Sequence, residues 1–124
     1  MDDLAHIFSS SRDAIGVSQA GTHVLVNPAY VSLFGFDDAG ELVGRSILDL
    51  IAPSARDTVI AHMRPRSAGE PAPALYETRG LRRDGSEFDL EVYASSYAVD
   101  GVVHTVVTLR DVTARNAEAR AMRE

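Results

Sequence analysis

The sequence predicts an α+β domain in which an antiparallel sheet is covered on one face by short helices. The first observation is the alternation of acidic and apolar residues from Glu87 to Val92, because a period of two marks a strand with one wet and one buried face. The second is a pair of tight-turn dipeptides, Asp84-Gly85 and Asp100-Gly101, on either side of this strand. The third is helical spacing between residues 27 and 63, which supplies the cover that the apolar face needs.

The N-terminal segment is expected to hold a short helix and two strands. Residues 2–10 form either a helix with an apolar stripe or a frayed terminus, and the sequence leaves both open. Residues 14–18 and 23–26 are strand-like, with a turn at Gly21 between them.

Helical features begin at Asn27-Pro28, since Asn is a good N-cap and Pro suits the first helical position. Three further short helices are expected after Asp38, Ser46 and Ser54, each with an acidic residue three positions later. The last of them should run over residues 55–63.

The remaining chain is expected to form a loop over residues 65–73, a three-strand meander, and a terminal helix. The meander begins with a strand over residues 74–81 and ends with the β-branched run of residues 102–109. Thr113 is the expected N-cap of a helix that either continues toward an output domain or ends as a simple tail.

Composition limits the function classes. A chain of 124 residues with 45% hydrophobic residues is expected to be one globular domain. It contains no Cys, so neither a disulfide framework nor a thiolate metal site is available, and the spacing of its His residues predicts no metal site. A net charge of −6 argues against a nonspecific nucleic-acid binder. Apolar runs are too short for membrane insertion and the start is acidic, so we expect a cytoplasmic location.

Six short sequence words, in this order, resemble the PAS sensory domain family over about residues 8–115. The words are Asp13-Ala14-Ile15, Asn27-Pro28-Ala29, Leu33-Phe34-Gly35-Phe36, Glu41-Leu42-Val43-Gly44, Arg82-Arg83-Asp84-Gly85 and Arg110-Asp111-Val112-Thr113. The resemblance implies a five-stranded antiparallel sheet of order 2-1-5-4-3 with the short helices on one face. It divides the chain into an N-terminal helical cap (1–12), a PAS domain (13–113) and the start of a linker helix (114–124). It also implies a non-enzymatic bacterial signalling module that forms homodimers.

In such a domain a ligand pocket would lie between sheet and helices, although the same residues could simply pack as a solid core. The residues that we expect to face this space are Ile15, Val17, Tyr30, Phe34, Ile51, Val59, Met63, Tyr76, Thr78, Phe88, Leu90, Val107 and Leu109. Tyr76 and Thr78 are the polar groups among the strand members. Alternation places His23 and His104 away from the Val24/Val26 and Thr105/Val107 faces.

The absence of Cys excludes a covalent flavin adduct and a Cys-linked chromophore, the cofactors of two branches of the family. Haem-binding members use a His near the start of the fourth helix, where this chain has Arg56. His62 is the one residue on that helix that could still ligate haem, and a surface or helix-end His is the competing interpretation. A non-covalent flavin or another small molecule remains open.

The resemblance also assigns structural and signalling roles. Glu41 and Arg83 are expected to form an ion pair that ties the short helices to the turn before the fourth strand. Asp111 and Thr113 mark the junction through which a signal would leave. The outer sheet face and the N-terminal stripe form the expected dimer face, made of Leu4, Ile7, Phe8, Leu25, Tyr93 and Val106, with Tyr97 beside it.

Three functions follow from these expectations. The first is a sensor that binds a small ligand or partner and relays its state to an output domain such as a histidine kinase or diguanylate cyclase. The second is a ligand-free dimerisation or protein-interaction module. The third is a small enzyme, against which the sequence offers no nucleophile elbow, phosphate-binding glycine loop or cluster of His and acids.

Overall fold

The structure, a computed structural model, describes residues 2–123, and for residues 2–4 it describes the backbone alone. The elements are α1 (Asp2–Ser10), β1 (Ala14–Gln19), β2 (Thr22–Val26), α2 (Pro28–Leu33), η1 (Ala39–Glu41), η2 (Ile47–Leu50), η3 (Pro53–Ala55), α3 (Arg56–Ser67), β3 (Leu75–Leu81), β4 (Glu87–Val99), β5 (Val102–Asp111) and α4 (Thr113–Arg123). The five strands form one antiparallel sheet in the order β2-β1-β5-β4-β3. The predicted fold class is therefore confirmed.

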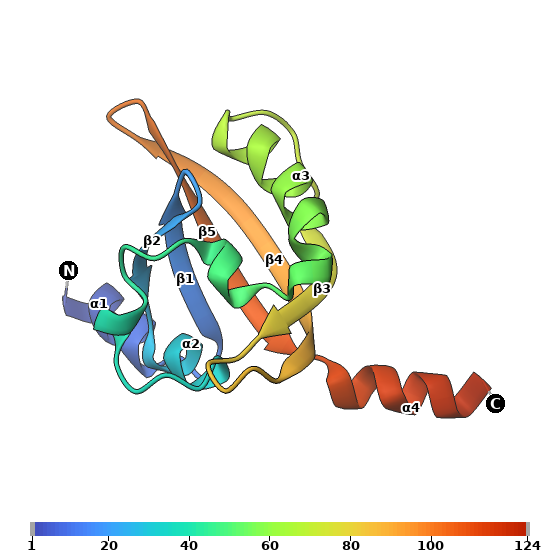
Figure 1. Cartoon of the computed structure of the whole chain (residues 1–124). Helices are drawn as coiled ribbons and strands as arrows, with labels where there is room; N and C mark the ends of the chain where they lie inside the picture. Colours follow the sequence, from blue (N-terminus) through green and yellow to red (C-terminus); the bar gives the residue numbers. More distant parts are fainter. Residues whose placement is uncertain (1, 124) are drawn as a thin grey trace.

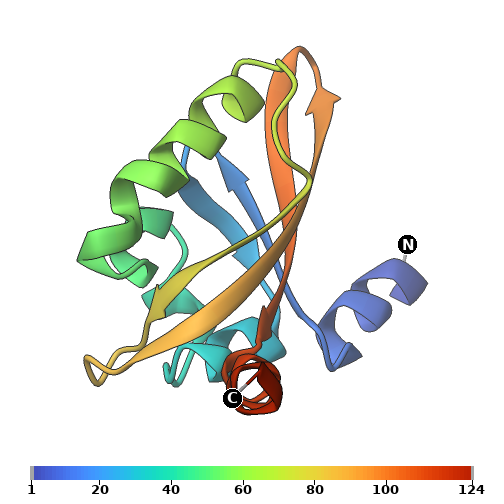
Figure 2. The same cartoon turned by 90° about the vertical axis from the view of Figure 1, so that its right-hand side faces the viewer.

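One face of the sheet is covered and the other is open. The helical segment from α2 to α3 lies across one face, and α4 projects away from the body at the end of β5 (Figure 1). Figure 2 shows α1 on the side of the sheet opposite α3. Among the described residues, none of the helices combines the length and apolarity needed to cross a lipid bilayer.

The core lies between the helical layer and the sheet. Phe34 and Val59 of the helical layer and Phe88 and Leu90 of β4 are each at most 2% exposed. Phe34 links the two layers, because its ring centroid lies 5.7 Å from that of Phe88 and 5.2 Å from that of Tyr30. The acidic residues that alternate with Phe88 and Leu90 point to the other face, as the period of two predicted.

Asn27 joins three segments at the start of the helical layer. Its side chain is fully buried, and its Oδ1 accepts hydrogen bonds from the backbone N–H groups of Ile15 (2.9 Å) and Tyr30 (3.0 Å). The amide nitrogen donates to the carbonyls of Phe8 (3.0 Å) and Asp13 (2.9 Å). The predicted N-cap of α2 therefore also fixes the end of α1 and the start of β1.

The expected phase of β1 was wrong for Ile15 and Val17. Gly16 pairs with Val107 and faces the helical layer, whereas Ile15 pairs with Thr108 and Val17 with Val106 on the opposite face. The reason is the approach of Tyr30, because a Cβ at Gly16 would lie 2.7 Å from its ring. A close aromatic neighbour thus takes the space that a larger inward side chain would need.

A bulge in β2 reverses the expectation for His23. Ser18 pairs with His23 and Val17 with Leu25, which leaves Val24 as an extra residue. His23 and Val26 consequently share the inner face, and His23 is 3% exposed. His104 does lie away from the Val107 face, where its ring stacks on Tyr97 at 5.2 Å.

Helix α3 is longer than predicted at its C-terminal end and lacks the expected cap. It continues through Pro65 to Ser67, so residues 65–67 are helical rather than loop. Pro65 has no N–H to donate to the carbonyl of Ala61, so α3 continues past it without one of its helical hydrogen bonds. At the other end Ala55 is the N-cap and makes no side-chain hydrogen bond, while Ser54 lies inside η3.

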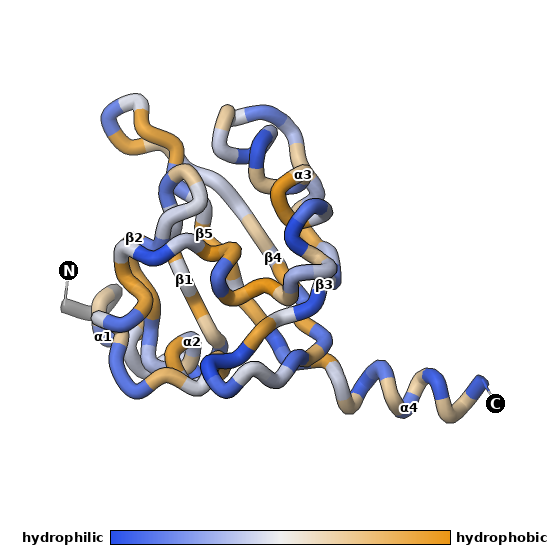
Figure 3. Tube along the Cα trace, in the orientation of Figure 1, coloured by the Kyte–Doolittle hydropathy of each residue, from blue (hydrophilic) through white to orange (hydrophobic). Residues whose placement is uncertain are grey.

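The open face of the sheet carries exposed apolar and aromatic side chains. Leu25, Tyr93 and Tyr97 are 48%, 57% and 43% exposed, and Val106 is half-buried. Ile7 on α1 is 61% exposed, so this residue of the N-terminal stripe is not buried against the sheet. The side chain of Leu4 lies outside the described residues. Figure 3 shows that hydrophobic residues continue along the β4–β5 hairpin where it extends past the helical layer.

Candidate functional site

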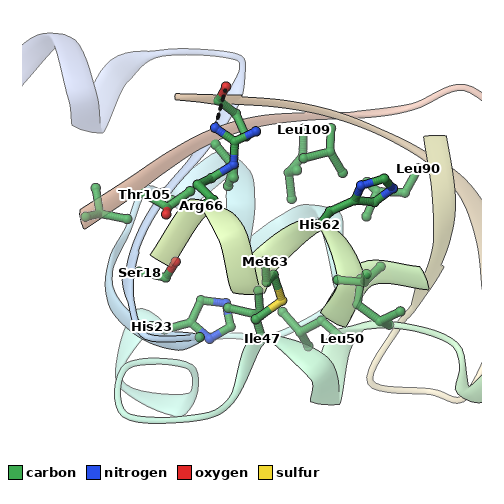
Figure 4. A pocket seen from close by; sticks show the side chains of 18 of the residues that line it. Ser18, His23, Ile47, Leu50, His62, Met63, Arg66, Leu90, Thr105 and Leu109 are labelled. Carbon is green, nitrogen blue, oxygen red and sulfur yellow. Dashed lines mark hydrogen bonds between the residues drawn. The ribbon is translucent and has the colours of Figure 1, made fainter. Parts of the chain in front are cut away.

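A cavity of about 60 Å³ lies between α3, α2 and the sheet (Figure 4). Its wall is mostly apolar, with seven polar side chains besides the phenol of Tyr30. The lining residues are Gly16, Val17, Ser18, Gly21, His23, Tyr30, Phe34, Ile47, Leu50, Ile51, Val59, His62, Met63, Arg66, Ser67, Tyr76, Leu90, Val92, Ala94, Thr105, Val107 and Leu109. Of the described residues in this wall, none is Asp or Glu.

Most of the predicted pocket residues come together here. Those that line the cavity are Val17, Tyr30, Phe34, Ile51, Val59, Met63, Tyr76, Leu90, Val107 and Leu109. Val17 borders it although the strand register places its side chain with Val106 on the other face.

Three predicted pocket residues lie elsewhere. Ile15 points to the open face of the sheet, opposite Thr108. Phe88 is buried under Phe34 in the core, and a Cβ at Gly80 would lie 2.6 Å from its ring, so no space is left beside it. Thr78 faces inward opposite Leu90, but it does not border the cavity, and its buried hydroxyl oxygen has no hydrogen-bond partner.

The structure adds polar residues to the site that sequence reasoning did not place there. His23 enters through the β2 bulge, which alternation does not reveal. Ser18 and Thr105 face inward as a cross-strand pair once the phase of β1 is corrected. Arg66 lies on the part of α3 that was expected to be loop. His62 was considered as a haem ligand, and it lines the cavity.

The buried end of the cavity is formed by a hydrogen-bonded His and Tyr. His23 Nε2 lies 2.7 Å from Tyr30 Oη, and His23 Nδ1 lies 2.8 Å from the carbonyl oxygen of Arg45. A carbonyl can only accept, so Nδ1 carries the proton and Nε2 accepts from the phenol. Burial lowers the pKa of His23, against a smaller upward effect of the Arg45 carbonyl, and it raises the pKa of Tyr30 far above its ordinary value. Both groups are therefore neutral at pH 7.

The other end of the cavity lies beside solvent, between α3 and β3. The rings of His62 and Tyr76 are in contact, with their centroids 4.3 Å apart and their planes tilted by 31°. The Arg66 guanidinium donates to the backbone carbonyls of Pro73 and Ala94. Burial raises the pKa of the Tyr76 phenol, and the positive charge of Arg66 partly offsets this. All three side chains are half-buried, so they form the edge past which a ligand would enter.

The cavity does not fit haem or flavin as it stands. A cavity of about 150 Å³ accommodates benzene, so a volume of about 60 Å³ is too small for a porphyrin or a tricyclic ring. Both ring nitrogens of His23 are hydrogen-bonded, and the ring of His62 packs against that of Tyr76. Arg56, at the position expected for a haem ligand, instead donates to the carbonyls of Leu48 (3.1 Å) and Ile51 (3.2 Å), which ties the start of α3 to η2.

The helical layer and the turn before β4 are connected by an ion-pair cluster. Arg83 Nη1 lies 3.4 Å from Glu41 Oε2 and 3.1 Å from Asp37 Oδ2. Glu41 also accepts a hydrogen bond from the backbone of Asp37. Since these side chains are largely exposed, the cluster adds little to the free energy of unfolding, and its main effect is to position the helical layer relative to this turn.

The junction between β5 and α4 is held by directional hydrogen bonds. Asp111 accepts from Arg82 Nη2 (2.7 Å) and from the backbone N–H of Thr113 (3.0 Å). Desolvation raises the pKa of Asp111, but the hydrogen bonds from Thr113 and the Arg82 guanidinium outweigh it and keep that pKa below its ordinary value. Thr113 Oγ1 in turn accepts from the backbone of Asp89 (3.0 Å).

The first turns of α4 are also connected to the open face of the sheet. Arg115 Nη1 lies 2.8 Å from Glu91 Oε2, and Arg115 Nη2 lies 3.3 Å from Glu77 Oε2. Asn116 donates to Glu77 and to Asp89. The direction of α4 therefore depends on groups of both β3 and β4.

Comparison with known proteins agrees with this architecture. The C4-dicarboxylate transport sensor protein DctS of Rhodobacter capsulatus is 32% identical over 107 residues, which are 84% of this chain and 16% of that protein. The PAS domain of an HTR-like protein from Haloarcula marismortui superimposes with a TM-score of 0.72 at 27% identity, over 89% of each chain. An RNA-binding light-oxygen-voltage receptor superimposes with a TM-score of 0.78 at 26% identity, over 92% of this chain and 33% of that one. Residues 2–112 match the sequence pattern of the PAS fold, and the chain belongs to the PAS domain family.

Proposed function

We propose that this chain is the sensory domain of a signal-transduction protein. It binds a small ligand in the cavity and passes the change through α4 to an output domain, such as a histidine kinase or diguanylate cyclase. The observation that carries the proposal is the course of β5. Thr105, Val107 and Leu109 line the cavity, and the same strand continues through Asp111 into α4.

The relatives support a sensory role at the level of the domain. DctS is a sensor protein, and the chain spans 16% of its length. We divide the chain into a helical cap (1–12), a PAS domain (13–113) and a linker helix (114–124). We expect the linker helix to lead to an output domain in the same polypeptide. We place the domain in the cytoplasm of a bacterial two-component system, without nucleic-acid or membrane contacts of its own.

The mechanism is a shift between two packings of the helical layer on the sheet. A ligand moves this equilibrium only if it binds one packing more tightly than the other. Side chains of β5 report the occupied cavity, and the hydrogen bonds of Asp111 and Thr113 transmit a change in β5 to the first turn of α4.

Native mass spectrometry of the freshly purified protein tests the proposal. A retained small-molecule mass is expected, and the variant Ala94→Leu should lose it because the larger side chain fills the cavity wall. Ala98→Leu is the matched control, because Ala98 lies on the same strand and is exposed. A wild-type protein without added mass, whose thermal unfolding also matches that of Ala94→Leu, contradicts a ligand-binding role.

The open sheet face favours a second function, a dimerisation module that operates with or without a ligand. Leu25, Tyr93 and Val106 lie on this face, α1 lies on the same side of the sheet (Figure 2), and Ile7 of α1 is exposed. Packing α1 of one copy on the sheet of a second would bury both apolar surfaces. Analytical ultracentrifugation should show a dimer that Tyr93→Glu dissociates and that Ser32→Glu, an exposed change on the helical side, leaves intact.

A further inference from the structure

Arg66 carries a positive charge at the edge of the cavity without a carboxylate partner. Among residues 2–123, five other arginines form ion pairs, but no Asp or Glu oxygen lies within 4.0 Å of Arg66. Among the same residues, the hydrogen-bond partners of its guanidinium are the carbonyl oxygens of Pro73 and Ala94. A guanidinium has five N–H donors, so these two contacts leave donors available for a ligand.

The charge of Arg66 is not balanced by the rest of the cavity wall. In the described part of the chain no acidic residue lines the cavity, and the other ionisable groups of the lining are the imidazoles of His23 and His62 and the phenols of Tyr30 and Tyr76. A half-buried cation next to a low-dielectric cavity attracts an anion more strongly than an exposed one. The hydroxyls of Ser18 and Thr105 also line the cavity and can donate to an oxygen ligand.

The interior of the cavity favours an apolar group of few atoms. Leu50, Val59 and Leu109 form part of its wall, and the volume is about 60 Å³. At the buried end both ring nitrogens of His23 are already bonded, so no donor awaits a second charged group. Burying a carboxylate there without a partner would be costly.

We infer that the cavity binds a short-chain monocarboxylate, with its carboxylate on Arg66 and its alkyl tail among the apolar side chains. This assignment rests on the proposed sensory function and specifies the chemical class of its ligand. It separates monocarboxylates from dicarboxylates, because the site has one cation at the edge and an apolar interior.

Binding is measured with butyrate as the probe, by amide chemical shifts in two-dimensional NMR spectra of the intact chain. Saturable shifts are expected at Val107, Leu109 and Ala94, and they should be weaker for the neutral isostere butyramide and for succinate. Replacing Arg66→Gln should weaken butyrate binding about tenfold or more, since a charge-assisted hydrogen bond is lost. Arg64→Gln, an equal charge change at an exposed position on the same helix, should leave the affinity unchanged.

A second variant protects the test against misfolding. Arg66→Lys keeps the charge, so it should retain part of the affinity that Arg66→Gln loses. Thermal unfolding of both variants shows whether the loss of the contacts to Pro73 and Ala94 has unfolded α3. Partial rescue by lysine in two equally folded variants supports the anion site.

The outcomes distinguish the ligand class from the sensory function. If butyramide binds as tightly as butyrate and Arg66→Gln has no effect, the cavity takes ligands but the inferred class is wrong. If succinate binds more tightly than butyrate, the site is a dicarboxylate site and the inference is overturned. If no probe shifts the cavity resonances, the inference fails, while the retained-mass experiment decides the proposed function independently.

Discussion

His23 Nε2 accepts a hydrogen bond from Tyr30 Oη at 2.7 Å, and this pair lies at the buried end of the cavity. The backbone of His23 is also bonded to the following segment, since its N–H donates to Arg45 and its carbonyl accepts from Gly44. One imidazole thus connects β2, α2 and the segment before η2.

Replacing Tyr30→Phe should lower the free energy of unfolding by about 1–3 kcal/mol, because His23 Nε2 would be buried without a donor. Urea denaturation at neutral pH measures the change. Tyr97→Phe provides the control, since Tyr97 is exposed on the open face and should lose less than about 0.5 kcal/mol. Equal losses in the two variants would show that the buried hydrogen bond is unimportant.

Acidification should destabilise the protein through His23. Burial lowers its pKa below the ordinary value of 6.5, so the folded state binds fewer protons than the unfolded state below that pH. The contribution is complete above pH 6.5 and is lost as the pH falls from 6.5 through the lowered pKa. Denaturation at a series of pH values should show this slope in the wild type and a smaller slope in His23→Gln. An unchanged slope in the variant would assign the effect to another group.

Replacing Asn27→Asp should destabilise the domain although the two side chains are nearly identical in shape. An aspartate still accepts from Ile15 and Tyr30, but it cannot donate to the carbonyls of Phe8 and Asp13. Leaving buried polar groups unpaired costs about 1–3 kcal/mol each. Urea denaturation measures the loss, and amide exchange should show that the start of β1 opens more often. A stability equal to wild type would show that the two donated bonds contribute nothing.

Replacing Gly80→Ala should cost about 1–3 kcal/mol through overpacking, because the new Cβ would lie 2.6 Å from the Phe88 ring. Gly40→Ala is the matched control, since its nearest neighbour would be 3.4 Å away, at the side chain of Asp38. Thermal unfolding compares the two variants. A milder effect at Gly80 than at Gly40 would mean that the Phe88 ring moves aside freely.

Replacing Glu91→Gln should loosen α4 without unfolding the domain. Glu91 forms the shorter of the two ion pairs that Arg115 makes with the sheet, and Arg115 itself is exposed. Amide exchange in α4 should therefore become faster while the urea midpoint stays the same. Glu118→Gln, on the exposed part of α4, is the control and should change neither quantity.

The sequence predicted the architecture because the strongest patterns lie in the elements that form it. Alternation around Phe88 and Leu90 identified β4, and Asn27-Pro28 located the start of α2. The details that were missed depend on contacts distant in sequence. Gly16 faces inward because Tyr30 packs on it, and His23 is buried because Val24 is an extra residue in β2.

The candidate site was predicted less completely for the same reason. Its apolar wall follows from strand alternation and helical spacing, and most of those residues do meet around one cavity. The polar residues that were missed, His23, Ser18 and Arg66, depend on a bulge, on the phase of β1 and on the extension of α3 past Pro65. No local pattern encodes these three features.

The two ends of α3 are attached in different ways. At the first turn Arg56 donates hydrogen bonds to the carbonyls of Leu48 and Ile51. At the last turn Arg66, which lines the cavity, donates hydrogen bonds to the carbonyls of Pro73 and Ala94. Because Arg66 keeps N–H donors free beside these two contacts, a guest bound to it would be joined through one side chain to α3, to β4 and to the segment before β3.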